Sequence, residues 1–222
     1  FGFDKILPMN TGAEAVETAL KIARKWGYEK KGIPAGEAIL VVCKDNFHGR
    51  TTTIISFSND EDARKNFNPY TSGFEAVEYN DVNALKQLFE EKADKICGFL
   101  VEPIQGEAGV NVPSEGYLKA CEELCKQHNV LFIADEIQTG IARTGKMLAI
   151  DHENINADVL ILGKAVSGGV YPVSAVLAND DVMNVIKPGQ HGSTYGGNPL
   201  AAAVAMEALQ VVLDEKLADN SE

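Results

Sequence analysis

The chain has 222 residues, and its 45% hydrophobic and 23% charged content is that of an ordinary globular domain. Its formal net charge of −12 argues against a nucleic-acid partner, because binding a duplex requires clustered lysine and arginine. No apolar run approaches the length of about 18 residues that crosses a bilayer, so we expect no membrane-spanning segment. The chain does not begin with Met, and we expect it to be a piece of a longer protein.

The spacing of cysteines and histidines bears on compartment and metal binding. The chain contains four scattered cysteines, Cys43, Cys97, Cys121 and Cys125. This pattern favours buried thiols in a reducing compartment over a disulfide framework, so we expect a cytoplasmic location, with the mitochondrial matrix as the alternative. The histidines lie far apart and lack the close spacing of zinc ligands, so we expect no metal site.

Apolar runs alternate with stretches of helical periodicity along most of the chain. Four runs are typical of parallel strands buried on both faces: residues 38–43, 96–101, 130–134 and 159–162. Helical periodicity occupies residues 13–28, 81–92, 114–128 and 201–213. The alternation predicts an α/β fold with right-handed crossovers and a mostly parallel sheet. We expect residues 6–9 to form a further buried element, and residues 171–178 to form a strand that returns along the sheet in the antiparallel sense.

Two charged residues stand at the ends of neighbouring strands in this prediction. Lys164 follows an apolar run amid glycines, where desolvation disfavours an ammonium and favours a nucleophilic amine. A lysine that simply reaches solvent is the alternative. Asp135 closes another apolar run, where a carboxylate is costly unless a cation meets it. That cation is either a protonated pyridine nitrogen or Arg143, and the two strand ends can flank a single crevice.

Other polar groups follow strands or begin helices. Asn10 and Thr11 are helix N-cap residues, and a helix N-terminus behind a small-residue turn is suited to bind phosphate. An ordinary capped helix is the alternative. Phe47 and Arg50 follow the run at residues 38–43, where an aromatic ring can stack on a flat ligand and a guanidinium can bind a carboxylate. Carboxylates and a glutamine in residues 102–109 indicate a site at the next strand end.

Five motifs together resemble the class III, fold-type I aminotransferases that use pyridoxal phosphate. In family order they are residues 10–15 (NTGAEA), 102–106 (EPIQG), 135–140 (DEIQTG), 163–164 (GK) and 191–199 (HGSTYGGNP). The resemblance implies a three-layer sandwich with a mostly parallel central sheet, formed by residues 1–222 as the single large cofactor-binding domain of this fold. It also implies that the N-terminal arm and the small C-terminal domain of the family are missing.

The resemblance assigns roles to residues at these motifs. Lys164 would form the Schiff base with the cofactor and move a proton at the reacting carbon, and Asp135 would keep the pyridine nitrogen protonated. Phe47 and Ile137 would cover the two faces of the ring, and Gln138 would lie near its phenolic oxygen.

Further implied roles concern the phosphate and the partner subunit. Gly12 and Ala13 would give backbone amides to the phosphate. Thr194, together with Ser193, would reach the phosphate of the partner subunit's cofactor, because the family builds each site across a homodimer interface.

The resemblance also implies substrates. Residues 163–177 are most similar to the family members that transfer the δ-amino group of L-ornithine to 2-oxoglutarate, giving glutamate 5-semialdehyde and glutamate. Arg50 would hold the α-carboxylate of ornithine, and Glu107 would pair with an arginine beyond Glu222. Alternatives are an acetylornithine-type or 4-aminobutyrate-type transaminase, and a truncated inactive fragment that serves as a binding module.

Overall fold

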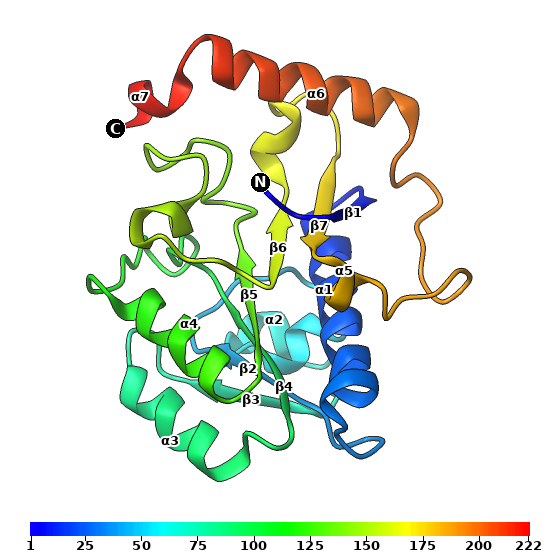
Figure 1. Ribbon diagram of the computed structural model, residues 1–222, viewed down its shortest axis with the longest axis vertical. Coiled ribbons are helices and arrows are strands. Elements are labelled where there is room, and N and C mark those ends of the chain that lie inside the picture. The colour runs from blue at the N-terminus through cyan, green and yellow to red at the C-terminus, as the bar shows by residue number, and fades with distance from the viewer.

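Seven strands form one sheet in the computed structural model, which describes residues 1–222 (Figure 1). The strands are β1 (Lys5–Met9), β2 (Ile39–Cys43), β3 (Phe74–Val77), β4 (Ile96–Val101), β5 (Leu131–Asp135), β6 (Val159–Leu162) and β7 (Ser174–Ala178). Their order in the sheet is β1-β7-β6-β5-β4-β2-β3, in which β2 to β6 run parallel and β7 runs antiparallel to both of its neighbours, β6 and β1. The four predicted parallel strands and the antiparallel return strand are therefore confirmed.

The chain has seven α-helices, some of which cover the two faces of this sheet. They are α1 (Gly12–Trp26), α2 (Glu61–Arg64), α3 (Val82–Lys92), α4 (Tyr117–Gln127), α5 (Asp180–Met183), α6 (Pro199–Asp214) and α7 (Leu217–Ser221). Figure 1 shows α1 on one side of the sheet and α3 and α4 on the other, which gives the predicted three layers. A 3₁₀ helix at Lys164–Ser167 follows β6, and α6 packs against it.

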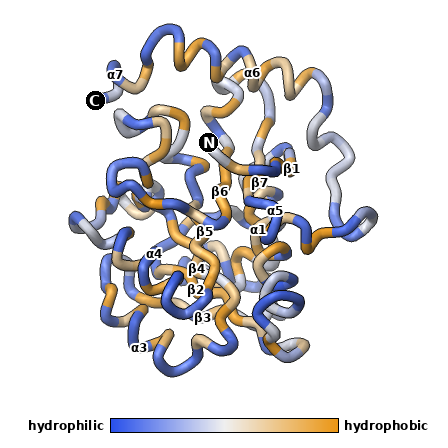
Figure 2. The backbone as a smooth tube through the Cα atoms, viewed as in Figure 1, coloured by the Kyte–Doolittle hydropathy of each residue, from blue (hydrophilic) through white to orange (hydrophobic).

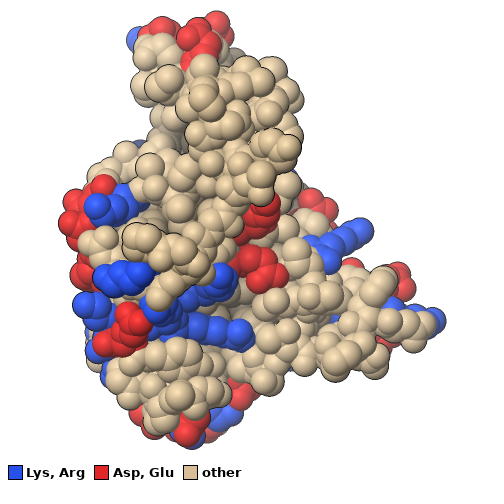
Figure 3. All heavy atoms as spheres, turned by 90° about the vertical axis from the view of Figure 1, so that its right-hand side faces the viewer, with Lys and Arg blue, Asp and Glu red and all other residues tan.

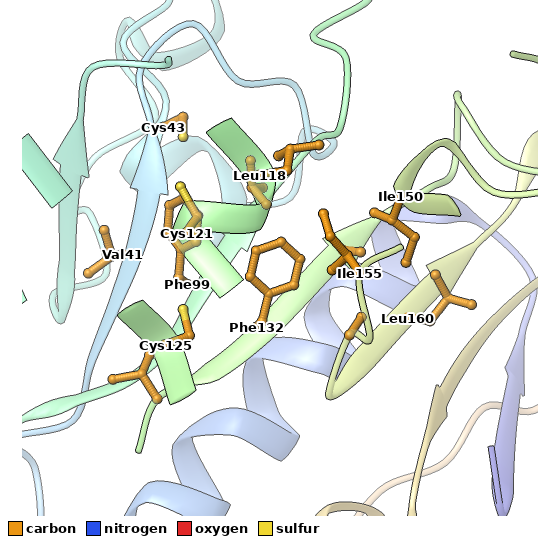
Figure 4. Packing of buried hydrophobic residues seen from close by; sticks show 14 of the residues in the cluster. Val41, Cys43, Phe99, Leu118, Cys121, Cys125, Phe132, Ile150, Ile155 and Leu160 are labelled. Carbon is orange, nitrogen blue, oxygen red and sulfur yellow. The ribbon is translucent and has the colours of Figure 1, made fainter. Parts of the chain in front are cut away.

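Strands β2 to β7 contribute to two hydrophobic cores, one on either face of the sheet. On β5, Phe132 and Ala134 face the core that contains α4, whereas Leu131 and Ile133 face the core that contains α1. This alternation explains why the strands read as continuous apolar runs, since both faces are buried. Figure 2 shows the central strands as the most hydrophobic part of the chain, and Figure 4 shows Phe132 beside Cys121, Cys125, Ile155 and Phe99.

The start of α1 is fixed by a capping box. The Thr11 Oγ1 accepts a hydrogen bond from the Glu14 N–H at 3.2 Å, and Glu14 Oε2 accepts from the N–H of Asn10 at 2.8 Å and of Thr11 at 3.1 Å. Burial opposes ionisation of Glu14, but the hydrogen bonds that its carboxylate accepts from Asn10 and Thr11 outweigh burial and lower the pKa of Glu14 below its ordinary value. Reciprocal capping of this kind stabilises a helix start and holds it in one place. Thr11, one of the two predicted cap residues, is the N-cap.

Two predictions about local structure need correction. Residues 6–9 are not buried as a unit, because β1 pairs only with β7 at the sheet edge and Ile6 is 62% exposed. Pro8 suits such an edge strand, since proline cannot donate to a ladder. The predicted helix at residues 114–128 begins only at Tyr117, after Gly116 with φ of 81°.

Helix α6 exposes much of its apolar surface. Only Ala201 is buried in this helix, and Leu200, Met206 and Leu213 are 56%, 66% and 59% exposed. Figure 3 shows few charged side chains over the upper part of the face where α6 lies. No helix of the chain combines the length and apolar character that crossing a membrane requires.

The central position of Phe132 generates a stability prediction. Its side chain is 1% exposed and packs edge-on against Phe99, with ring centroids 6.1 Å apart. We expect Phe132→Ala to lower the free energy of unfolding by about 3–5 kcal/mol, because the cavity cannot collapse in a close-packed core. The matched control Phe67→Ala, at a ring that is 59% exposed, should change it by about 0.5 kcal/mol or less. Urea unfolding measures both, and equal effects would contradict this assignment of the core.

Candidate active site

The carboxyl ends of four adjacent strands meet at one cavity. Strands β2, β4, β5 and β6 are parallel neighbours, so the loops that follow them lie at the same edge of the sheet. The cavity has a volume of about 180 Å³. It is lined by Gly12, Ala13, Phe47, His48, Gly49, Glu102, Ile104, Asp135, Ile137, Gln138 and Lys164. Most of the predicted site residues are therefore brought together.

Asp135 is a buried carboxylate with two partners from the protein. Its side chain is almost fully buried, its Oδ1 accepts from the N–H of Ile137 at 3.1 Å, and its Oδ2 lies 2.6 Å from Nδ1 of His48. The predicted alternative partner Arg143 is wrong: this side chain is exposed and lines a separate, larger cavity. The side-chain partner of Asp135 is the imidazole of His48.

His48 and Glu102 form one electrostatic group with Asp135. Burial disfavours the imidazolium of His48, but its hydrogen bond to Asp135 and the charges of Asp135 and Glu102 outweigh burial and raise its pKa. Burial raises the pKa of Glu102 to about 7, with Asp135 adding to the rise and His48 and Lys164 opposing it. Glu102 Oε2 also accepts from the N–H of Phe47 at 2.9 Å. The loop after β2 is thus tied to the ends of both β4 and β5.

Lys164 lies where the cavities of this region meet. It lines the 180 Å³ cavity with Asp135, a cavity of about 770 Å³ on the side of Arg143, and a third of about 350 Å³ beside Thr11 and Gly12. Its backbone φ is 41°, a strained value for a residue with a side chain and one found most often at functional sites. The predicted desolvation at the strand end is wrong, because Lys164 belongs to a 3₁₀ turn beyond β6 and is exposed.

The N-terminus of α1 supplies donors to the same region. The capping box satisfies the N–H groups of Thr11 and Glu14, and the N–H of Ala15 bonds to the Thr11 carbonyl at 3.1 Å. The N–H groups of Gly12 and Ala13 make no hydrogen bond within the chain. Two free donors at the positive end of a 15-residue helix form an anion site.

The close approach of α1 to Ile137 requires glycine at two places. A Cβ at Gly12 would lie 3.0 Å from the Cδ1 of Ile137, and a Cβ at Gly163 would lie 3.1 Å from its Cγ2. Ile137 therefore forms a wall of the cavity, between the helix start and the turn that carries Lys164. Phe47, which is 36% exposed, also lines the cavity.

The predicted substrate-binding residues lie outside the cavity wall. Arg50 is exposed, and its guanidinium carbon lies 5.7 Å from the centre of the Phe47 ring. Glu107 is exposed and accepts a long hydrogen bond of 3.5 Å from Nε2 of Gln138, which is a cavity residue. Both therefore stand next to the cavity, each beside one of its lining side chains.

Ser193 and Thr194 do not line the cavity. Ser193 Oγ accepts from Nδ2 of Asn10 at 2.8 Å, which places it next to the start of α1, and Thr194 is exposed. The predicted role of these residues toward a partner subunit stays a prediction.

Two residues of the site have no role assigned from the sequence, although Glu102 is one of the carboxylates that indicate a site at residues 102–109. His48 and Glu102 each follow a predicted parallel strand, and both are buried beside Asp135. Their position directly after a predicted parallel strand is the sequence feature that identifies them as candidates for the site. The pairing itself joins residues 87 positions apart, and nothing in the local sequence specifies it.

Comparison with known proteins identifies the family. Residues 1–222 match the family model "Aminotransferase class-III", and the chain belongs to this family. The mitochondrial ornithine aminotransferase of Arabidopsis thaliana is 62% identical over 221 residues, which is 100% of this chain and 46% of that protein. The mitochondrial ornithine aminotransferase of Drosophila melanogaster is 60% identical, with 100% and 51% covered. The chain spans about half the length of these curated relatives.

Solved structures agree with this family. An ornithine aminotransferase from Toxoplasma gondii superimposes with a TM-score of 0.97 at 57% identity, covering 99% of this chain and 52% of that one. A second structure of that enzyme shows partial occupancy of PLP at its active site. An acetylornithine aminotransferase from Elizabethkingia anophelis gives a TM-score of 0.85 at 60% identity, covering 98% and 50%. The predicted fold class, fold-type I, is confirmed.

The glycine at the rim of the cavity generates a second prediction. Gly49 has φ of 126°, and a Cβ there would lie 2.9 Å from the Cβ of Ala13. Gly36 has φ of 85°, but a Cβ added there would meet no atom within 4 Å. We expect Gly49→Ala to cost about 1–3 kcal/mol more than Gly36→Ala in free energy of unfolding, because only Gly49 adds overpacking to backbone strain. Denaturant titration measures the difference, and equal losses would show that α1 and this loop are not in close contact.

Proposed function

We propose that this chain is the cofactor-binding domain, residues 1–222, of a pyridoxal 5′-phosphate-dependent aminotransferase. In this proposal the enzyme transfers the δ-amino group of L-ornithine to 2-oxoglutarate, giving glutamate 5-semialdehyde and glutamate. The observation that carries the proposal is that Lys164 and Asp135 line one cavity from the ends of adjacent strands. Family membership supports the reaction class, and about 60% identity to ornithine aminotransferases supports the substrate.

The residues present fit this cofactor. The free N–H groups of Gly12 and Ala13 suit its phosphate, the Asp135 carboxylate suits its ring nitrogen, and the amine of Lys164 suits its aldehyde. When bound, pyridoxal phosphate supplies an aldehyde that condenses with amines and a ring that withdraws electrons from the reacting carbon. The partnership of Asp135 with a buried imidazole leaves the carboxylate fixed and pointed at the same cavity.

Each side chain then has a defined task. The carboxylate of Asp135 holds a proton on the ring nitrogen, because a charge placed in a water-poor cavity stabilises the opposite charge strongly. The Lys164 Nζ takes a proton from the reacting carbon of the substrate and returns it, as a base close to its target does. Phe47, Ile137 and Gln138 line the same cavity, so Phe47 and Ile137 would cover the two faces of the ring and Gln138 would bind near its phenolic oxygen.

Substrate binding is assigned to the residues next to the cavity. Arg50 binds the α-carboxylate of ornithine through its planar fork of donors. Glu107 is an exposed carboxylate beside Gln138, so it can pair with a cationic group in one half-reaction and release that group in the other. The proposed substrates are therefore an amino acid and a 2-oxo acid.

We also propose that the protein forms a homodimer with shared sites, in which Ser193 and Thr194 reach the phosphate bound by the partner. The apolar surface supports an interface: Val170 is 78% exposed, Tyr195 is 69% exposed, and α6 exposes several apolar side chains. The expected cytoplasmic location stays a proposal, and the relatives named mitochondrial support the matrix instead.

An acetylornithine transaminase is a second candidate, because a structure of that name is 60% identical to this chain. A panel of amino donors separates the two. A decrease in cofactor absorbance in a single turnover with L-ornithine, but not with N-acetylornithine, supports the ornithine aminotransferase. The reverse preference supports the acetylornithine transaminase.

The role of Lys164 generates the third prediction. We expect Lys164→Ala to abolish the absorbance band that an amine-bound cofactor shows near the edge of the visible range, and to reduce turnover by at least about a thousandfold, since both nucleophile and proton carrier are lost. The exposed Lys65→Ala is the matched control and should leave band and turnover unchanged.

Two results would contradict this assignment. A Lys164→Ala protein that keeps the band would show that another amine holds the cofactor. A wild-type protein that takes up no pyridoxal phosphate would favour the alternative in which the chain is an inactive fragment acting as a binding module.

A further inference from the structure

The histidine beside Asp135 is itself a lining residue of the cavity. His48 is 3% exposed, and its Nδ1 lies 2.6 Å from Oδ2 of Asp135. Its Nε2 is buried without a hydrogen-bond partner. The imidazole is therefore held from its Nδ1 side alone, and the bond to Asp135 is the polar contact that fixes its orientation.

A second carboxyl group stands in the same cavity. Glu102 is 6% exposed, lines the cavity with His48 and Asp135, and accepts from the N–H of Phe47, the residue before His48. The loop that carries His48 is thus attached to the end of β4 through Glu102 and to the end of β5 through Asp135. The three side chains form one cluster, which we call the carboxylate–imidazole group.

The charge of this group depends on where its protons lie. Two buried carboxylates without a cation would be costly, and one imidazolium compensates for one of them. With His48 protonated, the group carries one negative charge when Glu102 is ionised and none when Glu102 is protonated. Asp135, Glu102 and, from the end of β6, Lys164 are the charged groups that act on this balance.

We propose that His48 is a positioning residue that donates its Nδ1–H to Asp135 and, together with Glu102, sets the charge of the cavity where Asp135 meets a protonated ring nitrogen. This inference rests on the proposed function for the identity of the ring. The arrangement of His48, Glu102 and Asp135 itself belongs to the protein without any ligand.

The proposal predicts how the charge of the carboxylate–imidazole group, and with it the cofactor affinity, changes with pH. The pKa of Glu102 is raised by burial to about 7, so Glu102 loses its proton as the pH rises through neutrality. Burial disfavours the imidazolium of His48, but the two carboxylates outweigh burial and raise the pKa of His48 above its ordinary value. The group therefore gains one negative charge between about pH 6 and 8, and the affinity for a cationic ring rises over that range.

The first arm of the test uses the cofactor-free protein. Nitrogen-15 NMR resolves the imidazoles of the four histidines, and the His48→Asn variant identifies the His48 signals by their loss. We expect His48 to remain doubly protonated through neutral pH, and Glu102→Gln to lower the midpoint of its titration. His128, His152 and His191 are internal controls whose midpoints should not move.

The second arm uses a matched pair of substitutions. An asparagine amide places its nitrogen near the Nδ1 position of histidine, whereas a glutamine amide places it near the Nε2 position. We expect His48→Asn to bind pyridoxal 5′-phosphate within about threefold of the wild-type protein, and His48→Gln to bind it at least about tenfold more weakly, the loss expected for one hydrogen bond to a charged group. Fluorescence titration measures the affinity, and its rise with pH should disappear in Glu102→Gln. Thermal unfolding of each variant separates these effects from loss of the fold.

Specific outcomes overturn the inference. Equal affinities for His48→Asn and His48→Gln would show that no donor at the Nδ1 position is needed. A titration midpoint of His48 that is the same in the wild-type protein and in Glu102→Gln would show that the two groups are not coupled. An inactive protein that still shows the coupling would defeat the proposed function alone. An active transaminase without the coupling would defeat this inference alone.

Discussion

A carboxylate buried at the end of β5 is the constraint on which the site depends. Asp135 lies at the end of an apolar strand, where an ionised group is tolerated only if donors or cations surround it. The backbone N–H of Ile137 and the imidazole of His48 provide two such partners. The carboxylate is thereby held in one orientation, facing a cavity that the amine of Lys164 also lines. A preorganised charge of this kind is what electrostatic catalysis requires.

The topology of the sheet places the remaining groups around that carboxylate. Because β2, β4, β5 and β6 run parallel as neighbours, their loops bring an aromatic ring, two acids, an imidazole and a lysine to one edge. The capped N-terminus of α1 adds two free amide donors beside them. The chemistry therefore follows from which residues end the strands, and the two hydrophobic cores keep those ends in register.

Much of this arrangement is predictable from the sequence, and the reason is physical. Strands buried on both faces read as apolar runs, so β2, β4, β5 and β6 are recognisable, and adjacency then places Asp135 near Lys164. The partnership of Asp135 with His48 is not predictable, because it is a contact between distant residues that only the folded sheet creates. The exposure of Ile6 is also beyond the sequence pattern, since hydropathy does not reveal that β1 lies at an edge of the sheet.

The central claim is that Asp135 holds a proton on the ring nitrogen of the bound cofactor. The most direct measurement is the nitrogen-15 chemical shift of pyridoxal 5′-phosphate labelled at that nitrogen and bound to the protein. We predict the shift of a protonated pyridine from pH 6 to pH 9, and a change toward the unprotonated value in Asp135→Asn. An unprotonated nitrogen in the wild-type protein across this range would contradict the account.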